Sequence, residues 1–372
     1  MIEVERAEGV YLYGPEGQHY IDLISGIGVS NVGHRHPRVV SALQAQLDRF
    51  LHVMVYGELV QSPQVQLAHK LAATLPAPLD NVYLVNSGSE AVEGAAKLAK
   101  RYTGRTELIS CQNAYHGSSQ GALSLSGNER FKRAYRPLLP GIRHIRHGNI
   151  EDLDLITHDT AAVFLETIQG EAGVRMASAD YFQALRARCD ETESLLILDE
   201  IQVGFGRTGK FWAFEWYNIV PDIVICAKGM GGGMPIGAFV ASQKIMNVLK
   251  ENPILGHITT FGGHPMSCVA SAATIDVIQE EGLTEQVAAK EALFRQHLQH
   301  PAIQEIRGKG LLLALEFESF DVLKPTIDRA LAAGILTDWF LYCDSAMRLA
   351  PPLTITPDEI AQSCQILINC MP

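Results

Sequence analysis

Long apolar runs and an excess of basic residues are both missing from this sequence. No uninterrupted apolar run approaches the roughly 20 residues that a membrane-spanning helix needs. The first residues, MIEVERAEG, contain no apolar stretch behind a basic flank, so we expect no signal peptide. The 30 lysines and arginines are outnumbered by 41 aspartates and glutamates, and the net charge is −11. Neither a membrane nor a nucleic acid is therefore an expected partner.

Cysteine pairing signals are missing as well. The seven cysteines are an odd number, and none lies in a CxxC pair. Free thiols in a reducing cytoplasm fit this pattern better than a disulfide framework or a cysteine-based zinc site. Two histidine pairs, His34 with His36 and His144 with His147, have spacings that could hold a metal. Because no HExxH motif and no acidic cluster accompanies them, we expect structural histidines and no metal.

The composition is otherwise that of an ordinary globular protein, with 47% hydrophobic and 19% charged residues. A chain of 372 residues is too long for one small core and suggests two domains. Six short runs are rich in valine, isoleucine and leucine and do not alternate between apolar and polar residues. This pattern is typical of strands that are buried on both faces. These runs are 82–85, 107–110, 161–166, 195–199, 222–227 and 237–242.

Helical patterns lie between the predicted strands, for example at 90–104 and 179–191. The alternation of strands and helices predicts a mostly parallel α/β sheet over residues 80–245. After residue 265, long helical patterns lead to the apolar run KGLLLALEFE and a final helix after TPDE, which indicates a smaller α+β unit. We predict an N-terminal segment that packs with the small domain, a large domain and a C-terminal small domain. Their ranges are 1–55, 56–280 and 281–372.

Polar residues follow four of the predicted strands. Ligands of open α/β sheets bind at the carboxyl ends of the strands. The stretch 86–89, with sequence NSGS, follows the first strand, Glu166 and Asp199 each end a strand, and Lys228 follows another. The sequence therefore predicts that these four strand ends face one crevice.

The stretch NSGSE predicts the start of a helix that could bind an anion. Ser87 and Glu90 have the spacing of a capping box. Gly88 allows close approach of the backbone to a ligand, and free N–H groups with the helix dipole favour a phosphate. Taken alone, the stretch is explained more simply as an ordinary capped helix.

Three further residue types suit a planar, charged ligand. Asp199, in an apolar setting, needs a partner and could hold a proton on a heteroaromatic nitrogen, with Gln202 beside a neighbouring oxygen. Alternatively, Asp199 caps the following turn. Tyr115 or His116 in AYHGSS could stack on a planar ring, or could be an aromatic residue packed in a loop.

Lys228, in ICAKGMGGGMP, stands alone between an apolar run and a glycine-rich loop. It is either a solvated lysine at a strand end or an amine that does chemistry. Desolvation lowers the pKa of a lysine and makes its amine a nucleophile at neutral pH. A phosphate cradle, an aspartate, an aromatic residue and an isolated lysine together fit pyridoxal 5′-phosphate.

At this point the chain resembles a known family, the class III aminotransferases, which are pyridoxal-phosphate enzymes of fold type I. It looks most like the acetylornithine/ornithine aminotransferase branch. The most specific stretch is LDEIQVGFGRTG followed by PDIVICAKGMGGGMPIGA. The similar stretches span nearly the whole chain: 9–43, 86–100, 115–117, 166–174, 198–209, 221–238, 259–265 and 348–353.

The resemblance implies roles around the cofactor, which the large domain would bind. Lys228 resembles the lysine that forms the Schiff base, Asp199 the aspartate that keeps the pyridine nitrogen protonated, and Gln202 the glutamine beside the ring hydroxyl. Tyr115 matches the stacking aromatic residue, and His116 follows it in the same motif.

The resemblance also implies contacts to phosphate and substrate. Gly88 and Ser89 match the phosphate-binding turn, and Thr260 matches a threonine that reaches the phosphate from the other subunit of a homodimer. Three further residues match the substrate side of the site. Arg348 corresponds to the arginine for the substrate's α-carboxylate, Glu171 to the glutamate that pairs with it, and Glu166 to a further active-site glutamate.

The activity implied is transamination from an amino acid or ω-amine to a 2-oxo acid, with 2-oxoglutarate as the expected acceptor. A 4-aminobutyrate or lysine aminotransferase, an aminomutase or a decarboxylase remains an alternative within the same fold. Three positions depart from the family pattern. Ser118 replaces an arginine that grips a second substrate carboxylate, Thr167 replaces a proline, and His264 replaces an asparagine. The first departure leaves the amino donor open.

Two other motifs suggest different functions. Residues 117–121 satisfy GxSxG, and with Asp199 and His257 they give the residue order of an α/β-hydrolase that uses Ser119. A nucleophile elbow needs a strand directly before it, and NAYH is a poor strand. Residues 204–210 nearly fit a P-loop, but Phe211 occupies the position of the Mg²⁺-binding Ser or Thr.

Overall fold

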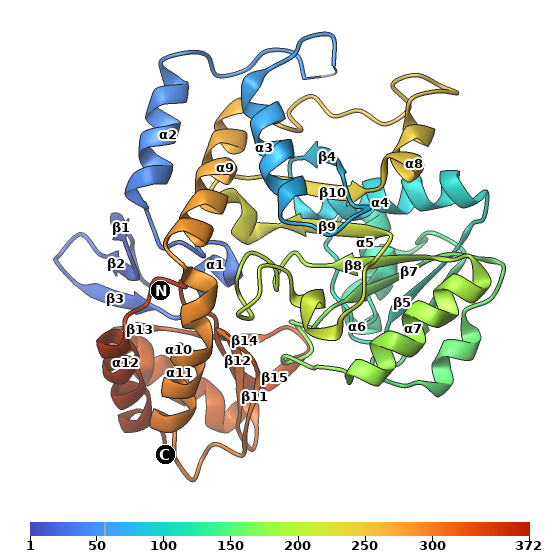
Figure 1. The fold of residues 1–372 in the computed structure, drawn as a ribbon. Helices are drawn as coiled ribbons and strands as arrows, with labels where there is room; N and C mark the ends of the chain where they lie inside the picture. Colours follow the sequence, from blue (N-terminus) through green and yellow to red (C-terminus); the bar gives the residue numbers. More distant parts are fainter. Residues whose placement is uncertain (56) are drawn as a thin grey trace.

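A seven-stranded sheet forms the centre of the computed structural model, which describes residues 1–55 and 57–372 (Figure 1). Its strand order is β4-β10-β9-β8-β7-β5-β6, and only β10 runs antiparallel to its neighbours. The strands are β4 (Asn81–Val85), β5 (Glu107–Cys111), β6 (Ile142–Ile145), β7 (Thr160–Glu166), β8 (Leu195–Asp199), β9 (Ile223–Ala227) and β10 (Gly237–Ala241). All six predicted strands and the mostly parallel sheet are confirmed.

The unpredicted strand, β6, lies at the edge of this sheet. Three of its four residues are only partly buried, and its sequence IRHI carries two polar side chains. It therefore lacks the continuous apolar run that marks the inner strands.

Both faces of the sheet are covered. Helices α4 (Gly88–Thr103) and α5 (Gln120–Leu125) pack with alternate strand residues such as Phe164 and Phe239. Helices α3 (Ser62–Ala73), α7 (Ala179–Thr192) and α9 (Pro265–Glu280) pack with the intervening strand residues on the other face. Burial on both faces explains why β7, β8, β9 and β10 have no exposed residue.

Two smaller sheets involve the ends of the chain. The first has the order β1-β2-β3-β13, with β1 (Arg6–Glu8), β2 (Tyr11–Tyr13), β3 (His19–Asp22) and β13 (Ile335–Leu336). Strands β3 and β13 pair in parallel, so N-terminal and C-terminal residues share one sheet. The second has the order β11-β12-β15-β14, with β11 (Glu305–Lys309), β12 (Leu312–Glu316), β14 (Asp338–Phe340) and β15 (Cys343–Leu349). The domain boundaries given above stay a prediction.

The remaining α-helices connect and flank these sheets. They are α1 (Ser25–Gly28), α2 (Pro37–Leu47), α6 (Glu129–Lys132), α8 (Gln243–Met246), α10 (Leu283–His297), α11 (Phe320–Ala332) and α12 (Pro357–Asn369). Among the described residues, no helix is both long and apolar enough to cross a membrane.

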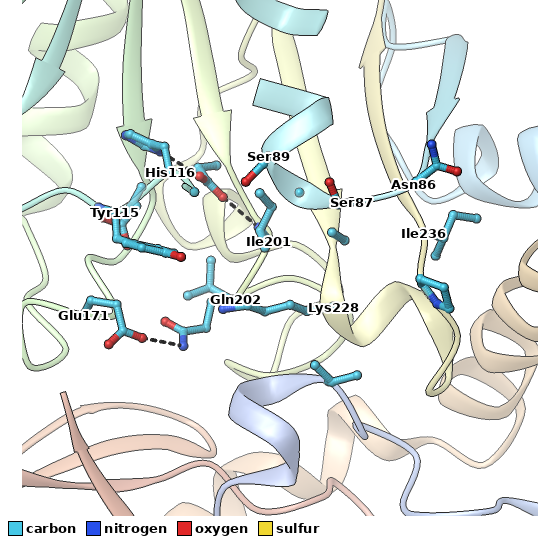
Figure 2. A pocket seen from close by; sticks show the side chains of 18 of the residues that line it. Asn86, Ser87, Ser89, Tyr115, His116, Glu171, Ile201, Gln202, Lys228 and Ile236 are labelled. Carbon is cyan, nitrogen blue, oxygen red and sulfur yellow. Dashed lines mark hydrogen bonds and ion pairs between the residues drawn. The ribbon is translucent and has the colours of Figure 1, made fainter. Parts of the chain in front are cut away.

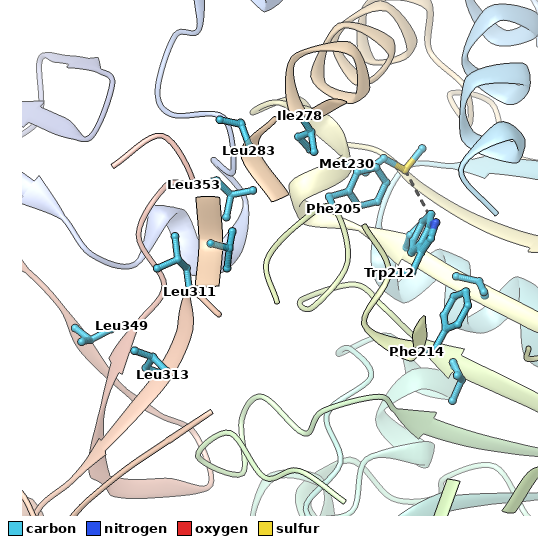
Figure 3. Close-up of a cluster of buried hydrophobic side chains, with 14 of the residues drawn as sticks. Phe205, Trp212, Phe214, Met230, Ile278, Leu283, Leu311, Leu313, Leu349 and Leu353 are labelled. Atoms are coloured by element: carbon cyan, nitrogen blue, oxygen red, sulfur yellow. Dashed lines mark hydrogen bonds between the residues drawn. The ribbon is translucent and has the colours of Figure 1, made fainter. Parts of the chain in front are cut away.

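A continuous hydrophobic cluster joins the central sheet to the C-terminal sheet (Figure 3). Phe205 and Trp212 follow β8, and Leu311 and Leu353 come from the C-terminal part. Arg207 is fully buried here: it donates hydrogen bonds to the carbonyl of Leu311 (2.9 Å) and the side chain of Asn31 (2.6 Å). The stretch that nearly fits a P-loop is therefore a buried connection between parts of the fold.

Gly94 lets helix α4 approach the sheet. A Cβ at this position would lie 2.3 Å from Cε1 of Phe239 on β10. Overpacking of this kind costs about 1–3 kcal/mol, whereas replacing a mid-helix glycine with alanine gains about 1 kcal/mol. We expect Gly94→Ala to lower the free energy of unfolding by about 1 kcal/mol in urea titrations. Lys97→Ala on the exposed face of α4 is the control, and equal stability of the two variants would contradict the close packing.

Candidate active site

A cavity of about 440 Å³ lies at the carboxyl ends of the central strands (Figure 2). The predicted residues of all four strand ends line it, so the expected crevice exists. Among the predicted site residues, those that line it are Gly88, Ser89, Tyr115, His116, Glu166, Glu171, Asp199, Gln202 and Lys228.

One wall of the cavity is the N-terminus of α4. Ser87 caps this helix, because its side chain accepts a hydrogen bond from the N–H of Glu90 (3.2 Å). The Glu90 carboxylate bonds to the backbone and side chain of Asn86 (2.8 Å each), one residue before the position that a full capping box requires. A Cβ at Gly88 would lie 2.8 Å from the Ile201 side chain, so glycine keeps this turn narrow. The 16-residue helix directs its positive end at the cavity, which favours an anion.

Asp199 and His116 form a buried pair beside this wall. Oδ2 of Asp199 lies 2.7 Å from Nδ1 of His116, and Oδ1 accepts a hydrogen bond from the N–H of Ile201 (3.0 Å). Burial by itself lowers the pKa of His116, but the hydrogen bond with Asp199 and the charges of Asp199 and Glu166 raise it overall. The histidine therefore holds the aspartate carboxylate in one orientation. Because His116 is paired with Asp199, Tyr115 is the one of these two aromatic residues that can stack on a planar ligand.

Glu166 adds a second carboxylate with a perturbed acidity. Burial, with a smaller contribution from the charge of Asp199, raises its pKa to about 7. Its two oxygens accept hydrogen bonds from the N–H groups of Tyr115 and Gly170 (2.9 Å each). Glu166 thus ties the loop that carries Tyr115 to the loop that carries Glu171.

Lys228 extends into the cavity from the end of β9. Its φ of +47° lies in the left-handed region, which is costly for a residue other than glycine and is found mainly where function requires it. Within residues 1–55 and 57–372, no hydrogen bond or ion pair involves Nζ. Burial lowers the pKa of this amine, and the nearby charge of Arg348 acts in the same direction. The side chain is therefore a desolvated amine directed into a cavity rather than a solvated lysine at a strand end.

Arg348 and Glu171 form an ion pair at the edge of the cavity. Nη1 and Nη2 of Arg348 lie 2.9 and 3.0 Å from the two oxygens of Glu171, in a bidentate arrangement. Only 1% of Arg348 and 4% of Glu171 is exposed, so each charge depends on the other. Nε2 of Gln202 lies 3.4 Å from Glu171, so the glutamine faces this pair (Figure 2).

Two predicted site residues do not line the cavity: Arg348, which reaches its edge through Glu171, and Thr260. Thr260 is exposed on a surface loop, where its carbonyl oxygen lies 3.0 Å from Nε2 of His52, and it does not line the cavity. In this chain alone Thr260 is therefore not part of the site.

Other lining residues were not predicted. Val29 comes from the N-terminal segment, and Ile201, Val203 and Ile236 supply apolar surface. Asp338 and Tyr342 also approach the site from the β14–β15 hairpin, through Arg348 and Tyr115. Ordinary apolar residues carry no distinguishing sequence signal, and the contacts of the hairpin depend on tertiary structure.

Two departures from the family pattern have structural explanations. Thr167 donates a hydrogen bond to the buried carboxylate of Glu200 (2.6 Å), a bond that proline could not form. His264 caps α9, because its Nδ1 accepts a hydrogen bond from the N–H of Met266.

The residues of the GxSxG motif and of the histidine pairs make other contacts than those a hydrolase or a metal site would need. Ser119 donates its hydroxyl hydrogen to Glu93 (2.7 Å), and in the described part of the chain no histidine is bonded to it. His257, the proposed base, lies 3.4 Å from Lys97 instead. His34 pairs with Asp22 (2.7 Å), and His144 lies 3.1 Å from two carbonyl oxygens. The GxSxG stretch is thus a helix start that contacts Glu93.

The family model described as "Aminotransferase class-III" matches residues 1–371. The chain belongs to the class III aminotransferases. An ornithine aminotransferase from Toxoplasma gondii ME49 is similar in structure, with a TM-score of 0.92, 30% identity and coverage of 99% of this chain and 90% of that one.

Two other solved transaminases are also similar to this class III aminotransferase. For an aminotransferase from Bacillus anthracis, the TM-score is 0.94 at 27% identity, with coverage of 100% of this chain and 93% of that one. For an amine transaminase from an uncultivated Pseudomonas species, the TM-score is 0.91 at 28% identity, with coverage of 100% and 94%. The fold is that of the fold type I transaminases.

Pyridoxal phosphate is the cofactor of this family, and the residues of the cavity fit it. The N-terminus of α4 suits the phosphate, and the aromatic ring of Tyr115 can stack on the pyridine ring. The carboxylate of Asp199 is held in place by His116. The isolated, buried amine of Lys228 is of the kind that can form a covalent bond with such a cofactor.

Loss of the Lys228 amine should abolish both cofactor retention and turnover. We expect Lys228→Ala to lack the visible absorbance of the bound cofactor after gel filtration. Because covalent and general-base roles are both lost, transamination should fall by at least about 10³-fold. Lys210→Ala, at an exposed position outside the cavity, should keep both properties. Turnover by Lys228→Ala near the wild-type rate would contradict the assignment of the site.

Proposed function

We propose that this class III aminotransferase moves an amino group from an ω-amine donor of the ornithine type to a 2-oxo acid, with 2-oxoglutarate as the acceptor. The ion pair of Arg348 and Glu171 at the edge of the cavity carries this proposal. When paired, the two side chains present no net charge to an amine donor. When Glu171 moves aside, the planar fork of Arg348 can bind the carboxylate of a 2-oxo acid.

In this proposal the cofactor is held by residues that line the cavity. Ser87, Gly88 and Ser89 bind the phosphate at the start of α4, and Tyr115 stacks on the ring. Asp199 holds a proton on the ring nitrogen, with His116 behind it and Gln202 beside the ring hydroxyl. Bound pyridoxal phosphate supplies an electron sink for the substrate carbon that loses a proton.

Lys228 has two tasks in the proposed reaction. Its amine would hold the cofactor covalently while no donor is bound. The freed Nζ then takes a proton from the donor carbon and returns it within the cavity, as general base and acid. Burial keeps the pKa of this amine low, which increases the fraction of the uncharged form at neutral pH.

We further propose a homodimer in the cytoplasm. Large apolar side chains are exposed on two segments near Thr260, and a second subunit would cover them. They include Leu51, Met54, Leu59, Val60, Ile254, Leu255, Ile258 and Phe261. In such a dimer Thr260 would reach the phosphate of the partner subunit. The seven cysteines are all free, which fits a reducing compartment.

The donor is the open part of the proposal. Ser118 stands where related enzymes have an arginine, and here it contacts Tyr115 (3.3 Å between hydroxyl oxygens) and Ser89 (3.2 Å). A neutral residue at this place weakens the grip on a donor's carboxylate. A 4-aminobutyrate or lysine aminotransferase is therefore the second candidate. The donors to compare are ornithine, acetylornithine, lysine, 4-aminobutyrate and a simple amine without a carboxylate.

Restoring the arginine tests this interpretation. We expect Ser118→Arg to raise kcat/KM about 10-fold to 100-fold for donors with a carboxylate, because a charge-assisted bidentate pair is worth about 1.5–3 kcal/mol. A simple amine should gain nothing. Ser118→Leu is the control for size. An equal change for all donors would show that residue 118 does not recognise the donor's carboxylate.

Removing the charge of Glu171 tests the proposed exchange at Arg348. Glu171→Gln keeps the volume but leaves Arg348 less neutralised, so the 2-oxo acid half-reaction should gain about 10-fold over the donor half-reaction. Single-turnover spectra of each half-reaction measure the ratio. Unchanged rates in both half-reactions would reject the exchange.

A further inference from the structure

The β14–β15 hairpin holds Arg348 from the side opposite to Glu171. Asp338 on β14 and Arg348 on β15 are directly paired residues in the antiparallel register. Oδ1 of Asp338 lies 3.0 Å from Nε of Arg348. The carbonyl oxygen of Trp339 accepts a hydrogen bond from Nη2 (3.3 Å), and the ring of Phe340 lies 4.6 Å from the guanidinium carbon. The three residues of β14, 338–340, therefore contact both the edge and one flat face of the Arg348 guanidinium.

The two carboxylates around Arg348 have different surroundings. Glu171 lines the cavity and bonds to the Nη edge of the arginine, where a substrate carboxylate would also bind. Asp338 forms an ion pair with the Nε edge and does not line the cavity. The same hairpin also contacts Glu171, since the N–H of Leu341 donates to its Oε2 (3.1 Å). Only the Nη edge is thus placed to exchange one carboxylate for another.

We propose that Asp338 is a positioning residue for the substrate carboxylate: it keeps the Nη edge of Arg348 directed at the cavity while Glu171 is replaced. This inference rests on the proposed exchange at Arg348. The guanidinium is planar, so an ion pair at Nε together with the ring of Phe340 sets the direction of the Nη edge. A buried guanidinium without that ion pair would follow Glu171 when the glutamate withdraws, because its charge needs a partner.

An opposite effect of Asp338 is also physically reasonable. As an anion beside Arg348, it reduces the attraction between this arginine and a substrate carboxylate. Glu171, Lys228 and Asp22 are the other charged groups that contribute near this pair. If repulsion dominated, removal of Asp338 would strengthen the binding of a carboxylate. If positioning dominates, removal weakens it, so the direction of the change decides between the two effects.

Binding of glutarate tests whether Asp338 positions Arg348 for a carboxylate. Glutarate carries the two carboxylates of 2-oxoglutarate but has no oxo group to react. We expect Asp338→Ala to raise the Kd of glutarate for the holoenzyme about 10-fold or more by isothermal titration calorimetry. Asp338→Asn keeps the size of the side chain but removes the charge of the ion pair, so its Kd for glutarate should rise in the same direction. The control is Asp344→Ala, an exposed position on the same hairpin, which should bind as wild type does.

Kinetics add a readout that a purely structural role would not reproduce. In Asp338→Ala, KM for 2-oxoglutarate should rise with little change in kcat, and the donor half-reaction should keep its rate. If the alanine variant does not fold, Asp338→Ser replaces it, since serine is too short to reach Nε. Tighter glutarate binding in Asp338→Ala, or equal losses in both half-reactions, would overturn the proposal.

A companion variant separates this inference from the proposed function. Arg348→Ala should lose glutarate binding. If it binds glutarate as tightly as wild type, the exchange at Arg348 is wrong and the role of Asp338 falls with it. If Arg348→Ala loses binding while Asp338→Ala does not, only the inference about Asp338 is overturned and the proposed exchange stands.

Discussion

The buried guanidinium of Arg348 is the interaction on which the arrangement of the site depends. It joins β15 of the C-terminal sheet to Glu171, which follows β7 of the central sheet 177 residues earlier. Breaking a buried pair costs far more than an exposed pair contributes, so these two parts of the fold are held in a defined relation. The cavity between them keeps its shape for the same reason. Fold stability and the proposed recognition of a carboxylate thus use the same side chain.

The rest of the site follows from the geometry of a parallel sheet. Four strand ends deliver a helix N-terminus, two carboxylates and a lysine to one edge, as the carboxyl ends of such strands do in general. Contacts between neighbouring loops then restrict these groups: His116 holds Asp199, and Glu166 bonds to two backbone N–H groups. The strained backbone at Lys228 is tolerated because buried strand β9 precedes it. The result is a preorganised set of largely buried charges.

Reaction class and substrate choice depend on different parts of the molecule. The cofactor region carries the features shared by class III aminotransferases, whose solved members include ornithine and amine transaminases of similar overall structure. The region of Ser118 and the β14–β15 hairpin surrounds the place where donor and acceptor would differ. In the proposed function, a change of a single charge there would alter which carboxylate is bound without altering the chemistry proposed for Lys228.

Local sequence was sufficient for the buried strands, the start of α4 and the residues at the strand ends, because apolar periodicity, capping and strand-end polarity are short-range properties. Edge strand β6, with its polar residues, lacked that signal. The partners His116–Asp199 and Arg348–Asp338 were decided only by the tertiary structure, since the first pair is 83 residues apart and the second meets across a hairpin with an irregular register. Such contacts depend on how whole elements pack, and no single stretch of sequence encodes them.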